Sequence, residues 1–473
     1  MCLSLVLRCR NRDRQVSHVK NISNLRYRKR QLHGYRQSVS QNNLKMKSNL
    51  IINDDQSAWI ENALLISALA LFPLLYLTLR GWTNTLAIVL FVIALFHFFR
   101  LPRSAWGIKN ISGTEWAVII ALASGFLAVL ISQLLRQNVV VKPYDGPLRM
   151  LLCAPVFLLL LKKKIDFVQI FQYICPLSLL ILLVFVHLYP FPIGTWGGRF
   201  GTYFVDPNTI GIYTMLLGFL CLFSIDAVSK DGMALRLLKC AGVLAGFYLE
   251  LKSKTRGAWI AEPAMLALWV AIHWQSKSKE ALFISTLISV LAILGFYFFI
   301  DFFHDRVNSI YYEIVSWINK TNTDTATGLR LSMWQISWVL FKHSPFYGYG
   351  DLGYQSQLLI PQIQSAFSQE AISTMRTVGP HNEYLANMVR SGIFGLIAVL
   401  LQFFVPGVVF IRGLKSSIKG IKSASAMGLC LVMGMMITSL SLEVLTLKYT
   451  CSFYGLMIAA LCASVLWKRP AEI

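Results

Sequence analysis

Three arginines are the residues of this chain whose type and setting best suit binding chemistry. Arg199 lies in the run WGGRFG, Arg256 in SKTRGAW and Arg330 in GLRLSMW. A guanidinium group stays charged and binds two phosphate oxygens at once, which a lysine does not match. We therefore interpret the three arginines as candidates for binding a phosphate or diphosphate. The alternative for each is a membrane anchor that contacts lipid phosphates.

His381 is the candidate for proton transfer. It stands in the run PHNEY, directly before a long apolar segment. A helix start disfavours the imidazolium, so we expect a neutral ring near pH 7. A neutral imidazole can accept a proton from a sugar hydroxyl. The alternative is an ordinary histidine at the membrane interface, and Arg376, a few residues earlier, is a further candidate for anion binding.

The elements that must position these residues are membrane helices. Hydrophobic residues make up 56% of the chain, charged residues only 14%, and mean hydropathy is +0.57, too apolar for a water-soluble domain. The long apolar runs approach or exceed the ~20 residues that cross a bilayer. We predict an all-α polytopic membrane protein with about twelve spans, near 58–79, 83–100, 114–135, 147–161, 165–190, 208–228, 237–252, 256–275, 281–301, 386–411, 423–445 and 448–467.

Lysine and arginine concentrate in alternate loops between these predicted spans, for example Lys162 to Lys164 and Lys415 to Lys422. By the positive-inside rule, that face and both termini are cytoplasmic. The polar segment 302–385, between the ninth and tenth spans, then lies on the opposite, extracytoplasmic side. Long polar excursions between spans commonly carry function.

The sixth, eighth and tenth predicted spans begin on the outer side, each beside one of the candidate residues. Asp206 suits an N-cap and Pro207 the first position of the sixth helix. Free N–H groups and partial positive charge at helix starts attract phosphate. Arg330 and Trp334 share one helical face, a pattern suited to a helix lying at the interface.

The basic segment 1–53 stands apart from residues 54–473, which we interpret as a single transmembrane domain. The net charge of +22 is concentrated before residue 50 and in short loops, which argues against nucleic acid as a partner. The segment is interpreted as a disordered cytoplasmic extension or as a gene start placed too early, with Met46 as the true start. Binding of anionic lipid headgroups is the alternative.

The sequence lacks the motifs of several common enzyme classes. There is no Walker loop, no GxSxG and no HExxH, and the acidic residues of 302–385 have no metal-binding spacing. We expect no metal and no cofactor. The cysteines, without a CxxC pair, are interpreted as small buried hydrophobic residues. Glu443, near a span end, is interpreted as structural.

Four short motifs in this order resemble the O-antigen ligase family. They are Arg199 with DPN at 206–208, TRGA at 255–258, Arg330 with Trp334, and HNEY at 381–384, and Gly392 and Gly395 fit as well. The resemblance covers roughly residues 58–467. It implies a GT-C-like glycosyltransferase fold with twelve helices. The basic segment 1–53 belongs to no motif of the family.

The resemblance implies that Arg256, Arg330 and His381 carry activity. The implied reaction moves O-antigen polysaccharide from undecaprenyl diphosphate to lipid A–core oligosaccharide on the periplasmic side. The short excursion, without a large carboxy-terminal soluble domain, favours this ligation over protein O-glycosylation. The predicted mechanism is metal-free: the arginines clamp the diphosphate and His381 is the general base. The remaining predicted substrate-binding residues are Arg199, Arg376, Trp334, Asn382 and Tyr384.

Two other functions stay open from the sequence. An O-antigen or other polysaccharide polymerase would use the same lipid-linked donor but a different acceptor. A transporter is the alternative from another class, and it would place ionisable residues near the bilayer middle. Here the basic residues crowd the ends of the spans instead. Membrane lipids are expected partners under each interpretation.

Overall fold

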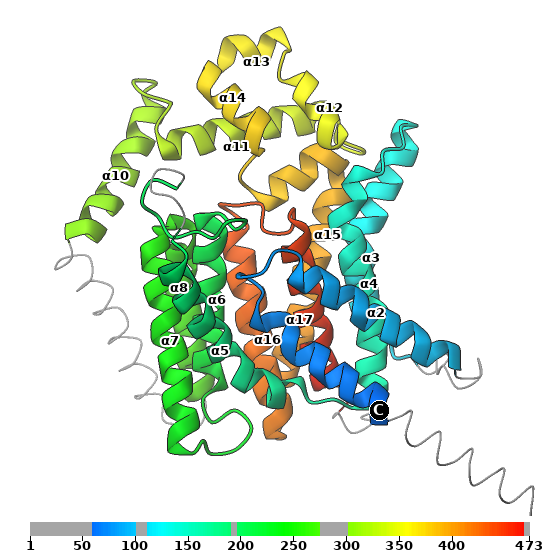
Figure 1. Ribbon diagram of the computed structural model, residues 1–473. Helices are drawn as coiled ribbons and strands as arrows, with labels where there is room; N and C mark the ends of the chain where they lie inside the picture. The colour runs from blue at the N-terminus through cyan, green and yellow to red at the C-terminus, as the bar shows by residue number, and fades with distance from the viewer. Residues whose placement is uncertain (1–58, 101–110, 191–195, 275–300, 468–473) are drawn as a thin grey trace, which may run out of the picture. The chain divides into compact units, whose positions relative to one another are not determined.

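The computed structural model describes residues 59–100, 111–190, 196–274 and 301–467, and within these ranges the chain is helical without β-strands (Figure 1). Eight of the described helices are long and apolar enough to cross a membrane. They are α2 (Trp82–Arg100), α3 (Gly113–Arg136), α4 (Asp145–Lys163), α5 (Phe167–Leu188), α6 (Pro207–Ser224), α15 (Glu383–Leu414), α16 (Lys419–Thr438) and α17 (Lys448–Leu466). The prediction of an all-α polytopic membrane protein is confirmed.

The predicted number of twelve spans stays a prediction. Helices α7 (Met233–Ser253) and α8 (Arg256–Trp274) form where the seventh and eighth spans were expected, but they are not among these eight candidate membrane spans. The first predicted span matches a shorter apolar helix, Trp59–Leu74. The ninth, 281–301, lies almost wholly outside the described residues, as do the extension 1–53 and the last residues, 468–473.

Helices α6 and α17 occupy the interior of the unit formed by Ile66–Ile473, since 89% of the apolar window of each is buried. Helix α17 packs against α4 and α16, and α6 packs against α7 and α16. Tyr76, Tyr213 and Phe453 interlock in stacked and edge-on pairs in this core. The buried α6 and α17 form a framework on which the outer ends of the neighbouring helices are fixed.

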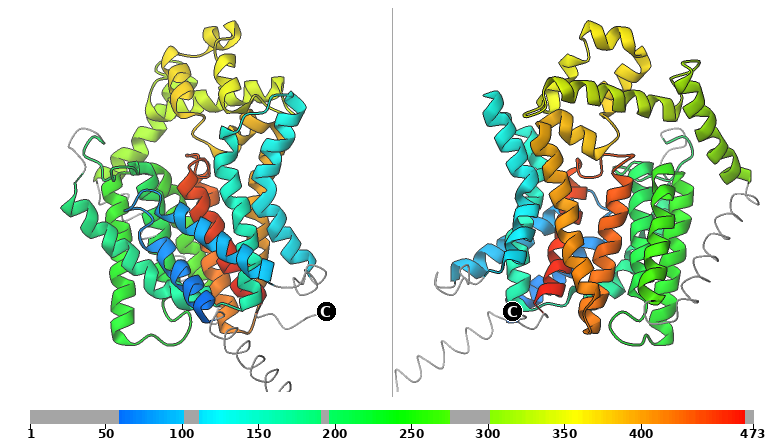
Figure 2. Two further views of the ribbon diagram at one scale, coloured as in Figure 1. Left: turned by 45° about the vertical axis from the view of Figure 1, so that its right-hand side comes forward. Right: turned by 180° about the vertical axis from the view of Figure 1, so that it is seen from behind.

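The segment 302–385 is a helical subdomain rather than an open loop. It contains α10 (Asp301–Ile318), α11 (Ala326–His343), α12 (Gly350–Gln357), α13 (Pro361–Ala366) and α14 (Gln369–Val378). Helices α11 to α14 share a buried apolar core that includes Ile336, Leu340, Ile363 and Met375. Val389 of α15 belongs to the same core, so the subdomain is anchored on a membrane helix. Figure 2 shows α11 to α14 lying across one end of the helix bundle.

The α11–α12 connection of the subdomain packs against a break in α15. Gly392 has φ 61° and ψ −147°, which interrupts the helix. The N–H of Ile393 donates to Pro345 O at 2.7 Å, and the N–H of Tyr349 donates to Val389 O at 2.9 Å. The α11–α12 connection therefore satisfies backbone groups next to the break, which would otherwise lack hydrogen-bond partners.

Two ion pairs lie at the end of the helix bundle opposite the α10–α14 subdomain. Arg236 pairs with Asp226 at 2.9 Å, and the fully buried Lys239 pairs with Asp231 at 2.9 Å. These residues follow the carboxyl end of α6, whereas the α10–α14 subdomain lies at the other end (Figure 1). The separation agrees with the loop assignment from charge, while the cytoplasmic and periplasmic sides themselves stay predictions.

Candidate active site

The starts of α6 and α8 are joined by a small network of hydrogen bonds. Asp206 caps α6 as predicted, accepting from the N–H groups of Asn208 at 2.9 Å and Thr209 at 3.2 Å, with Pro207 in the first turn. Thr255, directly before α8, donates its hydroxyl to Pro207 O at 2.9 Å. Two helix starts with their free N–H groups thus lie side by side.

Arg199 ties the α5–α6 loop to this network. Its Nε donates to Ser253 O at 2.7 Å, at the end of α7. Its Nη2 donates to Asn208 Oδ1 at 2.6 Å and to Thr255 Oγ1 at 3.5 Å. The guanidinium is half-buried between α6 and α8, so Arg199 holds the two helix starts together and adds positive charge to them.

Arg256 and Arg330 lie within electrostatic range of each other, and Arg199 lies within electrostatic range of Arg330. Arg256 is the first residue of α8, and Arg330 lies in α11 of the subdomain. Burial lowers the pKa of Arg330, the positive charges of Arg256 and Arg199 lower it further, and Glu313 opposes the shift. Like charges gathered in a half-buried place are costly unless an anion binds there. The structure therefore brings together the three arginines singled out from the sequence.

Glu313 is a member of this cluster that the sequence did not reveal. It lies on α10, with Oε1 3.7 Å from Arg256 Nη1 and Oε2 accepting from the N–H of Thr327 at 2.8 Å. It was counted only among scattered acids. Its partner is far away along the chain, so no local spacing marked it.

Two buried donors in the cluster have no hydrogen-bond acceptor among the described residues. They are Arg256 Nη1 and the indole N–H of Trp334. Trp334 lies one helical turn after Arg330 on α11. Buried donors without a protein acceptor are uncommon and call for an explanation. An anionic ligand between α8 and α11 would supply the missing oxygens.

His381 is the neighbour of Arg330 in the α14–α15 connection. Its backbone is left-handed, with φ 51°, which is uncommon for a residue other than glycine. Burial and the charge of Arg330 lower the pKa of the ring below its ordinary 6.5, while Glu443 and Asp206 act against the shift. The imidazole is therefore neutral at pH 7 and can accept a proton.

Glu443 links His381 to a second charged group. Its Oε2 pairs with Arg390 Nη2 at 2.7 Å, while Oε1 is buried without a hydrogen bond among the described residues. That free oxygen lies 2.3 Å from the position a Cβ would take on Gly379, two residues before His381. Only glycine fits there, with φ 79°, so the carboxylate can approach the connection that carries the histidine.

Three other predicted substrate-binding residues have different surroundings. Asn382 caps α15, since Oδ1 accepts from the N–H of Leu385 at 3.0 Å and Nδ2 donates to Leu440 O at 3.1 Å. Tyr384 donates its hydroxyl to Met436 O at 3.0 Å. The polar groups of both are thus occupied within the fold. Arg376 is exposed on α14, and no contact links its side chain to the arginine cluster within the described ranges.

Metal-binding geometry is missing from the part of the chain that the structure describes. No group of three or more His, Cys, Asp or Glu side chains there could hold an ion. The expectation of a metal-free reaction stays a prediction. The arginine cluster supplies positive charge at the place where a leaving diphosphate would need it.

Two comparisons with known proteins bear on this site. The sequence model described as O-antigen ligase matches residues 241–400, a range that includes Arg256, Arg330 and His381. An uncharacterized protein of Haemophilus influenzae is similar to this chain, with 26% identity over 351 residues, covering 73% of this chain and 84% of that protein.

Proposed function

Because this chain belongs to the O-antigen ligase family, we propose that it transfers a glycan from undecaprenyl diphosphate to a lipid A–core acceptor. The reaction takes place on the periplasmic side of the bacterial inner membrane. One observation carries the proposal: Arg199, Arg256 and Arg330 converge beside His381, although they come from three separate parts of the chain. An anion site next to a neutral base is what transfer from a diphosphate donor requires.

The arginine cluster binds the diphosphate of the donor. Arg256 and Arg330 contact its oxygens, and the N–H of Trp334 and the starts of α6 and α8 add further donors. Negative charge grows on the diphosphate as the bond between the anomeric carbon and the phosphate oxygen breaks. Fixed guanidinium groups in a water-poor site stabilise that charge in the transition state.

His381 acts as general base on the acceptor. The imidazole removes the proton of a sugar hydroxyl while that oxygen attacks the anomeric carbon of the donor. A new glycosidic bond forms, the diphosphate leaves with the electron pair of the broken bond, and the configuration inverts. The lowered pKa of His381 keeps the base unprotonated at neutral pH.

An apolar groove beside the cluster suits the polyprenyl tail. It lies between α5 and α7 and is lined by Leu183, Val184, His187, Leu188 and Tyr248. Phe200, the residue after Arg199, packs edge-on against His187 and Tyr248. A chain lying in the groove would leave the membrane next to Arg199, with its diphosphate at the arginines.

The decisive experiment is a gel of lipopolysaccharide from a strain that lacks the gene and carries wild-type protein or His381→Ala. We expect a long-chain ladder with the wild type only, and O-chains left on the carrier lipid with the variant. Membrane insertion of the variant is verified by immunoblot. A normal ladder with His381→Ala contradicts the proposed base. Single-unit O-chains in the deletion strain identify a polymerase instead, and glycan trapped on the cytoplasmic side identifies a transporter.

A further inference from the structure

A polar cavity lies apart from the arginine cluster, since none of Arg199, Arg256 and Arg330 lines it. It has a volume of about 220 Å³ and is bounded by the outer ends of α3, α4, α12, α15 and α17. Seven ionisable residues line it, and we call it the charged pocket: Arg136, Lys142, Asp145, Asp351, Glu383, Arg390 and Lys448. None of them belongs to the mechanism described above.

The charges in this pocket are partly paired. Lys448 Nζ lies 2.6 Å from Asp145 Oδ2, and Arg390 Nε lies 2.9 Å from Asp351 Oδ1. Within the described ranges, neither Lys142 nor Arg136 has an ion pair. The pocket therefore presents two cations that form no ion pair, Lys142 and Arg136, although the charge of Asp351 acts on Arg136, together with carboxylate oxygens held in fixed positions.

Part of the Arg136 guanidinium group is available to bind a ligand. Its Nη1 donates to Arg390 O at 3.0 Å and also to Tyr347 O. No hydrogen bond is recorded for Nε or Nη2 within the described part of the chain. Backbone carbonyls thus fix the side chain in place, and the remaining N–H groups are preorganised to bind an oxygen anion.

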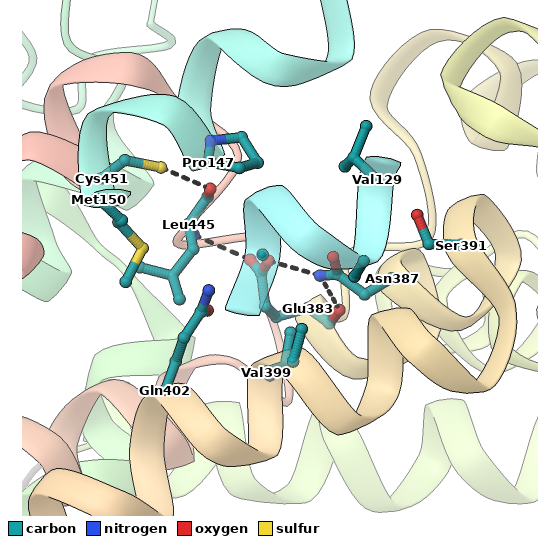
Figure 3. A pocket seen from close by; sticks show the side chains of 13 residues that line it. Val129, Pro147, Met150, Glu383, Asn387, Ser391, Val399, Gln402, Leu445 and Cys451 are labelled. Atoms are coloured by element: carbon teal, nitrogen blue, oxygen red, sulfur yellow. Dashed lines mark hydrogen bonds between the residues drawn. The ribbon is translucent and has the colours of Figure 1, made fainter. Parts of the chain in front are cut away.

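A smaller cavity of about 40 Å³ continues from the charged pocket into the bundle (Figure 3). Its wall carries Glu383, whose Oε2 accepts from the N–H of Leu445 at 2.8 Å and whose Oε1 accepts from Asn387 Nδ2 at 2.8 Å. Ser391 lies on the same shared wall. These polar groups hydrogen-bond to one another within the fold, and the wall they form suits a polar ligand such as a sugar ring better than an apolar one.

An ion pair between Arg390 and Glu443 connects the charged pocket to the surroundings of His381. Arg390 of the pocket pairs with Glu443, which in turn acts on the charge of His381. His381 is also the neighbour of Arg330 in the arginine cluster. In an inverting displacement the attacking oxygen approaches from the face opposite the leaving group. A diphosphate site and a separate polar site are thus both linked to His381, the polar site through the ion pair of Arg390 with Glu443, as a two-substrate transfer needs.

We propose that the charged pocket is the acceptor subsite and binds a sugar residue bearing a phosphate or carboxylate. Lys142 and Arg136 hold the anionic group, and the carboxylates and Asn387 orient the ring so that one hydroxyl faces His381. The volume, below the ~300 Å³ of pockets for drug-sized ligands, fits one sugar residue rather than a longer glycan. This assignment rests on the proposed transferase function.

Binding to the purified full-length protein tests the assignment separately from catalysis. The probe is core oligosaccharide freed from lipid A by mild acid, either intact or with its phosphates removed, titrated by calorimetry. Lys142→Glu should weaken binding of the intact core by about tenfold or more, as loss of a charged contact does. Thr446→Trp, at an exposed position on the pocket wall, should weaken it by obstruction. Removal of the phosphates should weaken binding to the wild type.

Controls separate this pocket from the arginine cluster. Lys230→Glu makes the same charge change on an exposed residue at the opposite end of α6 and should leave core binding unchanged. Arg256→Ala should lose binding of inorganic pyrophosphate but keep the core, and Lys142→Glu should do the reverse. Equal core binding by wild type, Lys142→Glu and Thr446→Trp overturns the acceptor subsite, even if pyrophosphate binding and transfer proceed as proposed. Equal binding of intact and phosphate-free core overturns it too.

Discussion

Arg256 and Glu313 face each other across the gap between the membrane bundle and the subdomain, with Nη1 3.7 Å from Oε1. The distance is too long for a hydrogen bond, and that Nη1 has no other acceptor among the described residues. Glu313 is instead held by the N–H of Thr327 at the start of α11. The carboxylate thus offsets part of the positive charge of the cluster without using the donors of Arg256.

Glu313→Gln should strengthen binding of the diphosphate. The amide oxygen can still accept from Thr327, while the charge that competes with an anionic ligand is removed. For a partly exposed pair we expect inorganic pyrophosphate to bind roughly two- to fivefold more tightly. The measurement is inhibition of transfer by pyrophosphate, with Glu370→Gln, on an exposed part of α14, as the matched control. Weaker inhibition would mean that Glu313 instead positions Arg256.

Arg256→Lys and Arg330→Lys should each lower the rate of transfer by ~10²–10³, as loss of a preorganised donor to a developing anion does. Lysine keeps the charge but lacks the planar fork that binds two oxygens. The rate is measured with lipid-linked donor in reconstituted vesicles. Arg412→Lys, on an exposed turn at the far end of α15, is the matched control and should keep full activity. Full activity in either cluster variant would contradict the clamp.

Local sequence signals predicted the parts of the site that depend on local structure. Asp206 and Pro207 marked the start of α6, because capping groups and their N–H partners are only two or three residues apart. Apolar runs marked most of the membrane helices. The arginines were chosen by residue type and by their position at predicted helix starts, and the structure brings Arg199, Arg256 and Arg330 together.

Long-range pairs were beyond the sequence. Arg390 and Glu443 are 53 residues apart, and neither lies in a pattern that names the other. Glu443 was interpreted as structural, yet its free oxygen lies beside the connection that carries His381. Of the helices of 302–385, only the one with Arg330 and Trp334 was expected, because the apolar residues of α11 to α14 form a core with one another and with α15 rather than continuous runs.

Transfer should lose rate in acid with an apparent pKa below 6.5, because the base must be unprotonated and burial beside Arg330 lowers the pKa of His381. Glu443 acts in the opposite direction and favours the protonated ring. Glu443→Gln should therefore move the acid limb of kcat/KM to still lower pH. Arg330→Gln, by removing a positive neighbour, should move it to higher pH at a much lower rate.

The pH profile of His381→Ala provides the control for these two shifts. Its residual rate should be lower by ~10²–10⁴ and should lack the acid limb. An unchanged limb in that variant would assign the titration to another group. Shifts of the same sign in Glu443→Gln and Arg330→Gln would contradict the electrostatic account, since the two charges are opposite.

Gly392→Ala should destabilise the protein and disturb the site together. At φ 61° and ψ −147° an alanine is strained, and its Cβ would lie 2.4 Å from the carbonyl carbon of Phe346. Strain of this kind costs about 1–3 kcal/mol, and relief requires the α11–α12 connection to move away from α15. Because α11 carries Arg330 and α15 carries Arg390, we expect lower thermal stability in detergent and reduced transfer. Gly407→Ala in the same helix has 3.7 Å to its nearest neighbour and ordinary helical geometry, so it should preserve both. Equal melting temperatures for the two variants would show that the break at Gly392 does not hold the subdomain in place.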